Sequence, residues 1–327
     1  MATSYSEAGV DIAKVRSIQD KINEAIFAGK KGALVGHYAG IVNFGGRKLA
    51  MHTDGVGSKV LVAQDMEKYD TVGIDAIAMN VNDLVCVGAR PIAGVDYIAL
   101  SKEDGFLVGE LLKGLMAGAQ ESGIDIIGGE TAILPDVIKG GSRPFDLAFT
   151  VIGEAGELIT GESIKEGDVI IGLESSGLHS NGYSLARKVL DVKKWGAQML
   201  APTKIYVKPV LNAISSCRLK GIAHITGGAF SKLTRLNQQK GFLLNSMPKP
   251  APIFEALNGQ VDDEREMHRT FNMGIGMCMI IDKMCEDHIL SGMEEMKKAG
   301  ISAMRVGEII AQPGVYLEKD GKRTRLD

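Results

Sequence analysis

The sequence of 327 residues lacks the features that mark secreted, membrane and nucleic-acid-binding proteins. No apolar run reaches the roughly 18 residues that a membrane-spanning helix needs. The N-terminal stretch MATSYSEAGVD lacks the basic and apolar segments of a secretory signal. The net charge is −3, so no broad basic field is present to attract nucleic acid. We therefore expect neither a membrane nor a nucleic acid as a partner.

Cysteine is scarce, and its spacing indicates neither a metal cluster nor a redox motif. The four cysteines occur at 86, 217, 278 and 285, with no CxxC pair among them. Together with the missing export signal, this predicts a reducing cytoplasm as the protein's compartment. Hydrophobic residues make up 45% and charged residues 24% of the chain, which is ordinary globular composition.

Helical and strand-like hydrophobic patterns alternate along most of the chain, which predicts two α/β halves. A polar, glycine-rich seam at 155–168 separates the halves, so we expect domains at 1–158 and 159–327. The glycine-bearing segment 30–48 has little periodicity and is expected to be a loop. Helices are predicted at 11–28, 71–87, 104–122, 181–191, 207–217 and about 284–298. Strands are predicted at 47–53, 91–100, 124–129, 145–154, 168–175, 276–282 and 303–310.

A strand leads directly into the sequence Asp54-Gly55-Val56-Gly57-Ser58-Lys59. Glycine lets a backbone approach a phosphate closely, lysine supplies a cation, and aspartate binds hard divalent ions. The GxxxxGK[ST] spacing of a Walker A loop is absent. The segment is therefore either an unusual phosphate-binding turn or a polar turn with a surface salt bridge.

Two further acidic positions occur in the same half. Asp83, with Asn80 and Asn82, interrupts an otherwise apolar helix, where these residues either cap neighbouring backbone or point at a metal. Glu130 follows a buried strand and two glycines, which is a common place for a ligand-binding carboxylate. Asp54, Asp83 and Glu130 together form the carboxylate set expected for Mg²⁺ that bridges phosphates.

Two polar turns precede predicted helices in the second half. In SSGLHSNGYSL, Ser180 or Asn181 is suited to cap a helix, and His179 is a possible proton carrier. In HITGGAF, Thr226 and two glycines likewise stand just before a predicted helix. Since helix N-termini attract anions, two such turns suggest a phosphorylated substrate.

In this order, these blocks resemble the phosphoribosylformylglycinamidine cyclo-ligase (AIR synthetase) family of purine biosynthesis. The resemblance covers most of the chain. Its motifs are YSEAGVDI, HTDGVGSK, MNVNDLVCVGARP, GGETAILPD, SSGLHSNGYSL, HITGGAF, TFNMGIGM and VGEI. The family belongs to an ATP-using superfamily that also includes thiamine-monophosphate kinase, selenophosphate synthetase and a hydrogenase maturation factor.

The resemblance implies an ATP- and Mg²⁺-dependent ligase. ATP would phosphorylate the formamide oxygen of formylglycinamidine ribonucleotide, and the amidine nitrogen would then close the ring of aminoimidazole ribonucleotide. Such an enzyme depends on positioning and charge neutralisation. The nearest alternative is another superfamily phosphotransferase such as thiamine-monophosphate kinase, and a second is a nucleotide-binding scaffold without turnover.

The family's functional residues carry over to matching positions. The resemblance implies metal binding by Asp54, Asp83 and Glu130, with a catalytic set of His179, Lys59 and Asn181. The implied ATP-binding residues are Gly36, Gly40, Gly45, Gly46, Gly55, Gly57, Ser58 and Lys59. The implied substrate-binding residues are Ser180, Asn181, Thr226, Gly227 and Gly228. The loop around Gly36–Gly46 would close over the nucleotide.

The resemblance also implies the architecture, which combines α/β and α+β features in two mixed-sheet domains. The N-terminal sheet would be flanked by helices and would pair with a second subunit into a barrel, giving a homodimer. The C-terminal sheet would be ferredoxin-like. The sequence departs from the family pattern in the two polar turns of the second half. Leu178 replaces the usual proline in SSGLHSNGYSL, and Ala229 replaces the usual third glycine in HITGGAF.

Overall fold

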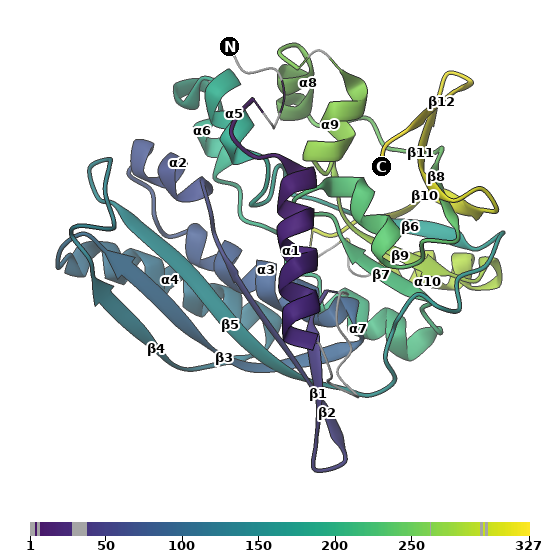
Figure 1. The fold of residues 1–327 in the computed structure, drawn as a ribbon, viewed down its shortest axis with the longest axis horizontal. Coiled ribbons are helices and arrows are strands. Elements are labelled where there is room, and N and C mark those ends of the chain that lie inside the picture. Colours follow the sequence, from purple (N-terminus) through teal and green to yellow (C-terminus); the bar gives the residue numbers. More distant parts are fainter. Residues whose placement is uncertain (1–3, 5–6, 28–37, 262, 295–296, 298–299) are drawn as a thin grey trace.

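The computed structural model describes residues 4, 7–27, 38–261, 263–294, 297 and 300–327, and contains two mixed β-sheets with helices (Figure 1). The position Gly36 lies outside the described residues. The first sheet has the strand order β1-β2-β5-β3-β4, in which only the β3–β4 pair is parallel. Its strands are β1 (Gly40–Phe44), β2 (Arg47–Gly55), β3 (Ala89–Leu100), β4 (Asp125–Ile133) and β5 (Phe145–Ala155).

Helices α3 (Val72–Cys86) and α4 (Gly105–Ser122) cover one face of the first sheet and lie behind it in Figure 1. Their backbones approach closely because glycines lie at the crossing. A Cβ on Gly73 would stand 2.3 Å from the backbone nitrogen of Leu115. Asp104 caps α4 by accepting a hydrogen bond from the amide of Leu107, and Gly123 ends the helix with φ of 75°.

The second sheet has the order β12-β11-β8-β10-β6-β9-β7 and is antiparallel except for the β8–β11 pair. Strand β9, between β6 and the edge strand β7, is buried along its whole length, which explains its continuous run of apolar residues. The strands are β6 (Val169–Glu174), β7 (Gly221–His224), β8 (Gly241–Leu244), β9 (Ile275–Ile281), β10 (Ala303–Ile310), β11 (Gly314–Lys319) and β12 (Lys322–Arg325).

The remaining helices belong mainly to the second half, and α1 (Ile12–Phe27) stands in front of the centre in Figure 1. The other α-helices are α2 (Lys59–Asp65), α5 (Tyr183–Val189), α6 (Val192–Met199), α7 (Val207–Ser216), α8 (Pro252–Asn258), α9 (Glu264–Thr270) and α10 (Glu286–Glu294). Two 3₁₀ helices are η1 (Ala229–Arg235) and η2 (Lys283–Cys285).

The predicted helices and strands are confirmed among the described residues, with shifts at their ends, and the ends of the helices predicted at 11–28 and 284–298 lie partly outside these residues. The strand expected at 124–129 continues to Ile133 and is mostly exposed, so Glu130 lies within β4 and does not follow a buried strand as predicted. The expected loop at 30–48 is partly wrong, because Gly40–Phe44 pairs with β2 as a strand. Gly45 and Gly46 form the two-residue turn between these strands, with φ of 57° and 80°. Both positive values match the tight turns that join antiparallel strands, and glycine adopts them without strain.

Helix α3 lies between the two sheets and is almost entirely buried. It contacts β2, β3 and β5 on one side and β7 and α7 on the other. A helix in this position has no solvent-exposed face, so its polar side chains need partners from both halves of the chain. Asp75, Asn80, Asn82 and Asp83 are such residues, and all four are buried.

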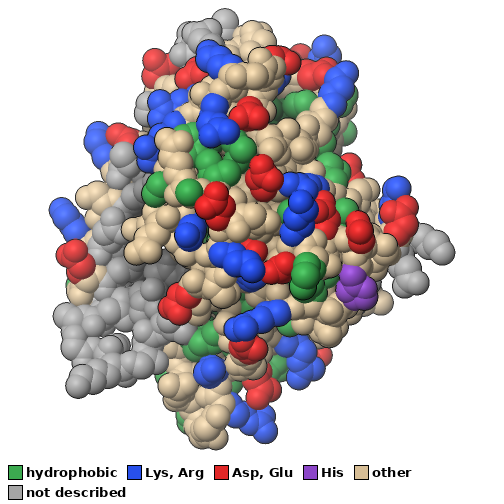
Figure 2. Space-filling model, turned by 90° about the vertical axis from the view of Figure 1, so that its right-hand side faces the viewer, with side chains coloured by type: hydrophobic (Ala, Val, Ile, Leu, Met, Phe, Trp, Pro, Cys, Tyr) green, Lys and Arg blue, Asp and Glu red, His purple; other side chains and the backbone are tan. Residues whose placement is uncertain are grey.

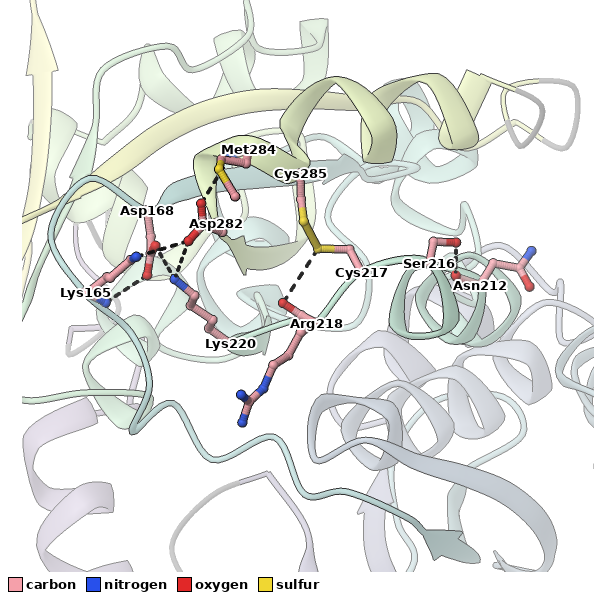
Figure 3. The surroundings of a disulfide bond; sticks show 10 residues. All are labelled: Lys165, Asp168, Asn212, Ser216, Cys217, Arg218, Lys220, Asp282, Met284 and Cys285. Atoms are coloured by element: carbon pink, nitrogen blue, oxygen red, sulfur yellow. Dashed lines mark hydrogen bonds and ion pairs between the residues drawn. A yellow bond between two sulfur atoms is a disulfide. The ribbon is translucent and has the colours of Figure 1, made fainter.

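A disulfide links Cys217, just after α7, to Cys285 in η2 (Figure 3). The sequence reasoning did not predict this pair, because the two residues are separated by 68 positions and no motif joins them. Closing a loop of this length lowers the conformational entropy of the unfolded chain, which raises the free energy of the unfolded state by roughly 4 kcal/mol. Beside the disulfide, Lys220 bridges Asp168 and Asp282 at 2.5 and 3.3 Å.

The face of the second half shown in Figure 2 carries acidic and basic side chains side by side. Neither sign of charge gathers into one large field on this face, in keeping with the net charge of −3. Within the described part of the chain, no helix combines the length and apolar character needed to cross a bilayer.

Candidate functional site

Two carboxylates from the first half meet where the two sheets face each other. Asp54 stands at the end of β2 and accepts a hydrogen bond from the amide of Gly55 at 2.8 Å. Asp83 projects from α3, on the helix-covered face of the same sheet. Burial raises the pKa of Asp54, and the nearby charge of Asp83 raises it further. The two acids therefore repel each other, and a cation between them would relieve that repulsion.

Asp83 is held by histidines from both halves. Its Oδ1 lies 2.7 Å from Nδ1 of His224, and its Oδ2 lies 3.3 Å from Nε2 of His52. Burial alone would raise the pKa of Asp83, but the hydrogen bond from His224 and the neighbouring charges lower it. Asp83 is thus kept ionised in a buried place, as a metal-binding or charge-stabilising carboxylate requires.

Asparagines on α3 fix these histidines. Asn80 faces Nδ1 of His52 through its side-chain oxygen at 3.0 Å and donates its amide to the carbonyls of Asp54 and Ala76. Asn82 lies 3.4 Å from Nε2 of His224 through its amide nitrogen. Its amide also donates to the carbonyl of Lys204 in the second half. Asn80 therefore bonds backbone carbonyls of its own helix and of β2, and Asn82 bonds a backbone carbonyl of the second half, in line with the expected capping of neighbouring backbone.

Glu130 does not join Asp54 and Asp83 within one chain. It lies exposed on β4, in register with Tyr97 on β3. Three strand spacings separate β2 from β4, which is about 14 Å. The register also places Glu130 on the sheet face opposite Asp54, since Asp54 aligns with Phe149 and Asp96 rather than with Tyr97. Among the described residues, no group of three acidic, histidine or cysteine side chains is suited to hold a metal.

The expected nucleotide-binding glycines fall into two separate places. Gly55 and Gly57 lie beside Asp54, and Gly57 has a φ of 69° that turns the chain into α2. Gly45 and Gly46 lie at the other end of β2, roughly 26 Å from Asp54 along the strand. Gly40 begins β1. Because of this strand length, Gly45 and Gly46 do not reach the site at Asp54 in the same chain.

Lys59 is completely buried between the two halves instead of lying on an exposed loop. Its ammonium lies 2.8 Å from a carboxylate oxygen of Asp75 and donates to the carbonyls of His179 and Ala201 at 3.0 and 2.7 Å. Asp75 in turn accepts the amide and hydroxyl of Thr203. All three ammonium hydrogens are engaged, so the expected contact with ATP phosphates is not available in this arrangement.

The two predicted substrate turns of the second half come together against the first half. The hydroxyl of Ser180 donates to the carbonyl of Val56 at 3.2 Å, which joins one turn to the glycine segment after β2. A Cβ on Gly227 would stand 3.2 Å from the side-chain oxygen of Asn181, so the turns are neighbours. Thr226 receives a hydrogen bond from Lys232. Ser58 lies 3.5 Å from Ser184, hydroxyl to hydroxyl.

His179 is enclosed rather than open to a ligand. Its side chain is fully buried, and a Cβ on Gly276 would stand 2.4 Å from its Cε1. Nε2 accepts a hydrogen bond from the amide of Ser176 at 3.3 Å, while Nδ1 has no partner among the described residues. Burial lowers the pKa of His179 well below its usual value, and the nearby His224 and Lys59 lower it further. The imidazole is therefore a weak base, and its enclosure keeps a ligand away from its ring nitrogens, which does not suit the expected proton carrier.

Backbone strain marks both substrate turns. His179 has a φ of 60°, a left-handed value that is uncommon for residues other than glycine. Ala229 has a φ of 40° immediately after Gly228 at 85°. At the position of Ala229, the family that this sequence resembles usually has a third glycine. The positive φ gives the physical reason for that preference. An alanine in this left-handed conformation carries about 1 kcal/mol of backbone strain that a glycine would not.

Sequence reasoning missed several residues of this site. His52 and His224 were not among the residues assigned to the site from the sequence, yet both contact Asp83. Lys232 and Asp75 were not singled out at all. Asp75 stands 16 residues after Lys59 with no motif between them, so only the fold brings them together. For Lys232, its place two residues after the end of the HITGGAF block was a usable signal.

Family profiles match both halves of the chain. The N-terminal domain of AIR synthase related proteins matches residues 36–155, and the C-terminal domain of the same proteins matches residues 165–320. The two matches together cover most of the sequence.

Curated relatives match over nearly their full length. The phosphoribosylformylglycinamidine cyclo-ligase of Methanocaldococcus jannaschii is 46% identical, with 94% of this chain and 92% of the relative covered. The enzyme of the same name from Saccharolobus solfataricus is 45% identical, with 86% and 87% covered. Among solved structures, AaThiL complexed with AMPPCP and TMP has a TM-score of 0.67 over 96% of each chain. Its identity of 15% makes this a similarity of fold alone.

The Lys59–Asp75 ion pair gives a stability prediction. Lys59→Met leaves a buried carboxylate without its partner, so we expect the free energy of unfolding to fall by about 3–5 kcal/mol. Lys59→Met combined with Asp75→Leu removes both charges and should recover much of that loss. The measurement is denaturant unfolding followed by circular dichroism.

The matched control is Lys68→Met, which removes the exposed ion pair between Lys68 and Asp70. That change should alter the free energy of unfolding by less than about 1 kcal/mol. A Lys59→Met protein as stable as the control would contradict the structural role of the buried pair.

Proposed function

This chain belongs to the AIR synthase related family, and we propose that it closes the imidazole ring of aminoimidazole ribonucleotide in purine biosynthesis. It would act as an ATP-dependent ligase on formylglycinamidine ribonucleotide. The observation that carries this proposal is the identity of 45–46% to relatives named phosphoribosylformylglycinamidine cyclo-ligase, over nearly the full length of both chains. The thiamine-monophosphate kinase alternative has weaker support, because the solved thiamine monophosphate kinase of Aquifex aeolicus is only 15% identical to this chain.

The chemistry fits a site built at the junction of two halves. An amide oxygen is a poor leaving group, so ATP first converts it to a phosphate ester, and the amidine nitrogen then displaces that phosphate. Such a reaction needs a triphosphate and an amide held in line, with charge neutralised around the transferred phosphoryl group. Asp54 and Asp83 come from the first half, and the turns with Ser180 and Thr226 come from the second.

ATP is proposed as the cosubstrate, held near Asp54. The open backbone at Gly57, in the segment with Gly55 and Ser58, supports this placement, because a Cβ on Gly57 would meet no atom within 4 Å and the space beside its amide can take phosphate oxygens. The neighbour AaThiL, of the same fold, was solved with the nucleotide analogue AMPPCP. Of the glycines predicted to bind ATP, Gly45 and Gly46 are assigned instead to the β1–β2 turn.

We propose that Mg²⁺ binds at Asp54 and Asp83, which supply two of the three carboxylates expected from the sequence. The repulsion between the two carboxylates and the ionised state of Asp83 favour a divalent cation, which would neutralise phosphate charge when bound. Glu130 does not fit the same ion within one chain. We propose that Glu130 contributes to metal binding only across a subunit interface, since it lies on the open face of the first sheet.

The substrate side is proposed at Ser180, Asn181, Thr226, Gly227 and Gly228. Their support is the contact between the two turns and their position opposite Asp54 and Asp83. For His179 we propose a positioning role instead of proton transfer, because its ring is enclosed and neutral. Lys59 supports the same turn by binding the carbonyl of His179.

We propose domain limits of 1–158 and 159–327, in line with the two separate sheets and with the profile matches that end at 155 and resume at 165. We also propose a ferredoxin-like core for the second domain. Its support is the antiparallel order β10-β6-β9-β7, in which four strands follow the sequence as fourth, first, third and second.

A homodimer is proposed through the uncovered face of the first sheet. Helices α3 and α4 cover the other face, whereas this one carries partly exposed apolar side chains from several strands. A patch of this kind on a sheet usually marks an interface between proteins. The side chains are Val42, Met51, Ile92, Val95, Tyr97 and Ile127, with exposed fractions of 39–69%.

The reaction is tested directly with purified protein, formylglycinamidine ribonucleotide, ATP and Mg²⁺. We expect ADP and aminoimidazole ribonucleotide in equal amounts. Thiamine monophosphate in place of the ribonucleotide is the control and should give no product. Turnover of thiamine monophosphate, or ATP binding without turnover of either compound, would reject the proposed function.

The metal assignment is tested by Asp83→Asn. Removing this charge should raise the Mg²⁺ concentration for half-maximal activity by at least about tenfold. Asp287→Asn, an exposed change on α10, is the matched control and should leave the Mg²⁺ titration unchanged. If both titrations overlay the wild-type curve, Asp83 does not bind the ion.

The dimer is tested by sedimentation velocity at micromolar protein concentration, where we expect the mass of two chains. Val95→Glu would place a charge in the interface and should shift the protein to a monomer. Val137→Glu changes an exposed valine outside the sheet and should leave the dimer intact. A monomeric wild-type protein would rule the proposal out.

A further inference from the structure

A second buried lysine lies at the same junction as Lys59, but its surroundings differ. Lys232 projects from η1 in the second half and is 9% exposed. Its ammonium donates a hydrogen bond to the hydroxyl of Thr226 and stands 5.9 Å from the centre of the Tyr38 ring. Arg235, one turn further on, faces the same ring at 5.8 Å. Tyr38 belongs to the first half, so the ammonium of Lys232 contacts residues of both halves.

Lys232 faces the two carboxylates of the candidate site. Burial and the charge of Arg235 lower the pKa of Lys232 to about 8, while Asp83 and Asp54 oppose that shift. The same attraction acts in return on Asp54 and Asp83, whose pKa values Lys232 lowers. At neutral pH the ammonium form predominates, so a positive charge stands opposite the two acids.

Lys232 keeps hydrogen-bonding capacity that Lys59 does not. An ammonium group has three hydrogens, and among the described residues only Thr226 accepts one from Lys232. Neither Asp54 nor Asp83 forms a direct ion pair with it. Burying a cation without a direct counter-ion is unfavourable, and such arrangements occur where a charged ligand supplies the missing partner.

We propose that Lys232 is a catalytic residue whose ammonium binds the phosphoryl group as it moves from ATP to the substrate amide. The inference rests on the proposed function and deepens it. In the step concerned, the amide oxygen bonds to the γ-phosphorus, the bond from that phosphorus to the β,γ-bridging oxygen breaks, and ADP leaves with the electron pair. Lys232 neutralises the phosphoryl oxygens from the second half, opposite Asp54 and Asp83 of the first.

This assignment transfers to Lys232 the role that motif position suggests for Lys59. Lys59 has three partners inside the protein, which leaves no ammonium hydrogen for a ligand. Among the residues that the structure describes, Lys232 has one hydrogen-bond acceptor, the hydroxyl of Thr226, which fixes the direction of its ammonium. Because Thr226 lies in a substrate turn, the cation is placed where nucleotide and substrate meet.

The test compares Lys232→Met with the wild-type protein in Mg²⁺-containing buffer. The probes are ADP and AMPPCP, which differ in the γ-phosphoryl group. We expect Lys232→Met to weaken AMPPCP binding at least about tenfold, because a charged hydrogen bond is lost, and to leave ADP binding unchanged. The turnover number should fall by at least about 100-fold, as for other transition-state donors. Lys232→Arg keeps the charge and should recover part of both losses.

The matched control is Lys208→Met, an exposed lysine of α7, which should change neither affinity nor turnover. If Lys232→Met does not reach the wild-type circular dichroism spectrum, Lys232→Gln replaces it. Equal weakening of ADP and AMPPCP would overturn the proposal, as would an increase in the KM of the ribonucleotide alone. Wild-type protein without cyclo-ligase activity would instead reject the proposed function, so the two failures are distinguishable.

Discussion

The buried polar contacts of α3 with the second sheet hold the candidate site in place. The Lys59–Asp75 pair binds the carbonyl of His179, and Asp83 binds His224 on β7. A buried polar group that loses its partner is strongly destabilising, so these contacts allow few relative positions of the two halves. Hydrophobic packing alone is not directional and would tolerate sliding. The polar network therefore fixes which turns of the second half face Asp54.

The two buried lysines show how similar residues at one junction acquire different roles. Lys59 is saturated by oxygens of the protein, and its charge is matched by Asp75. Lys232 faces two acids without touching them and shares one hydrogen with Thr226. The first arrangement stabilises a structure, whereas the second leaves binding capacity for an anion. The number of unused donors, rather than burial or charge, separates the two cases.

The open face of the first sheet and the position of Glu130 are connected. Strand alternation places Asp54 under α3 and Glu130 with Tyr97 on the uncovered side. The same alternation places apolar side chains such as Val95 beside Tyr97, on the side that α3 and α4 leave free. An acidic residue that the family motif links to metal therefore lies on the surface proposed for the partner subunit.

The sequence by itself determined the periodic elements, the two-sheet class and the family, because helix and strand repeats and motif order are local properties. It also located the polar turns at 179–181 and 226–228. Tertiary structure decided the partners. A motif names Lys59 but not Asp75, because only the fold brings these two residues together. Which side chains meet across a junction depends on strand register and helix orientation, and these are set by packing between segments far apart in the chain.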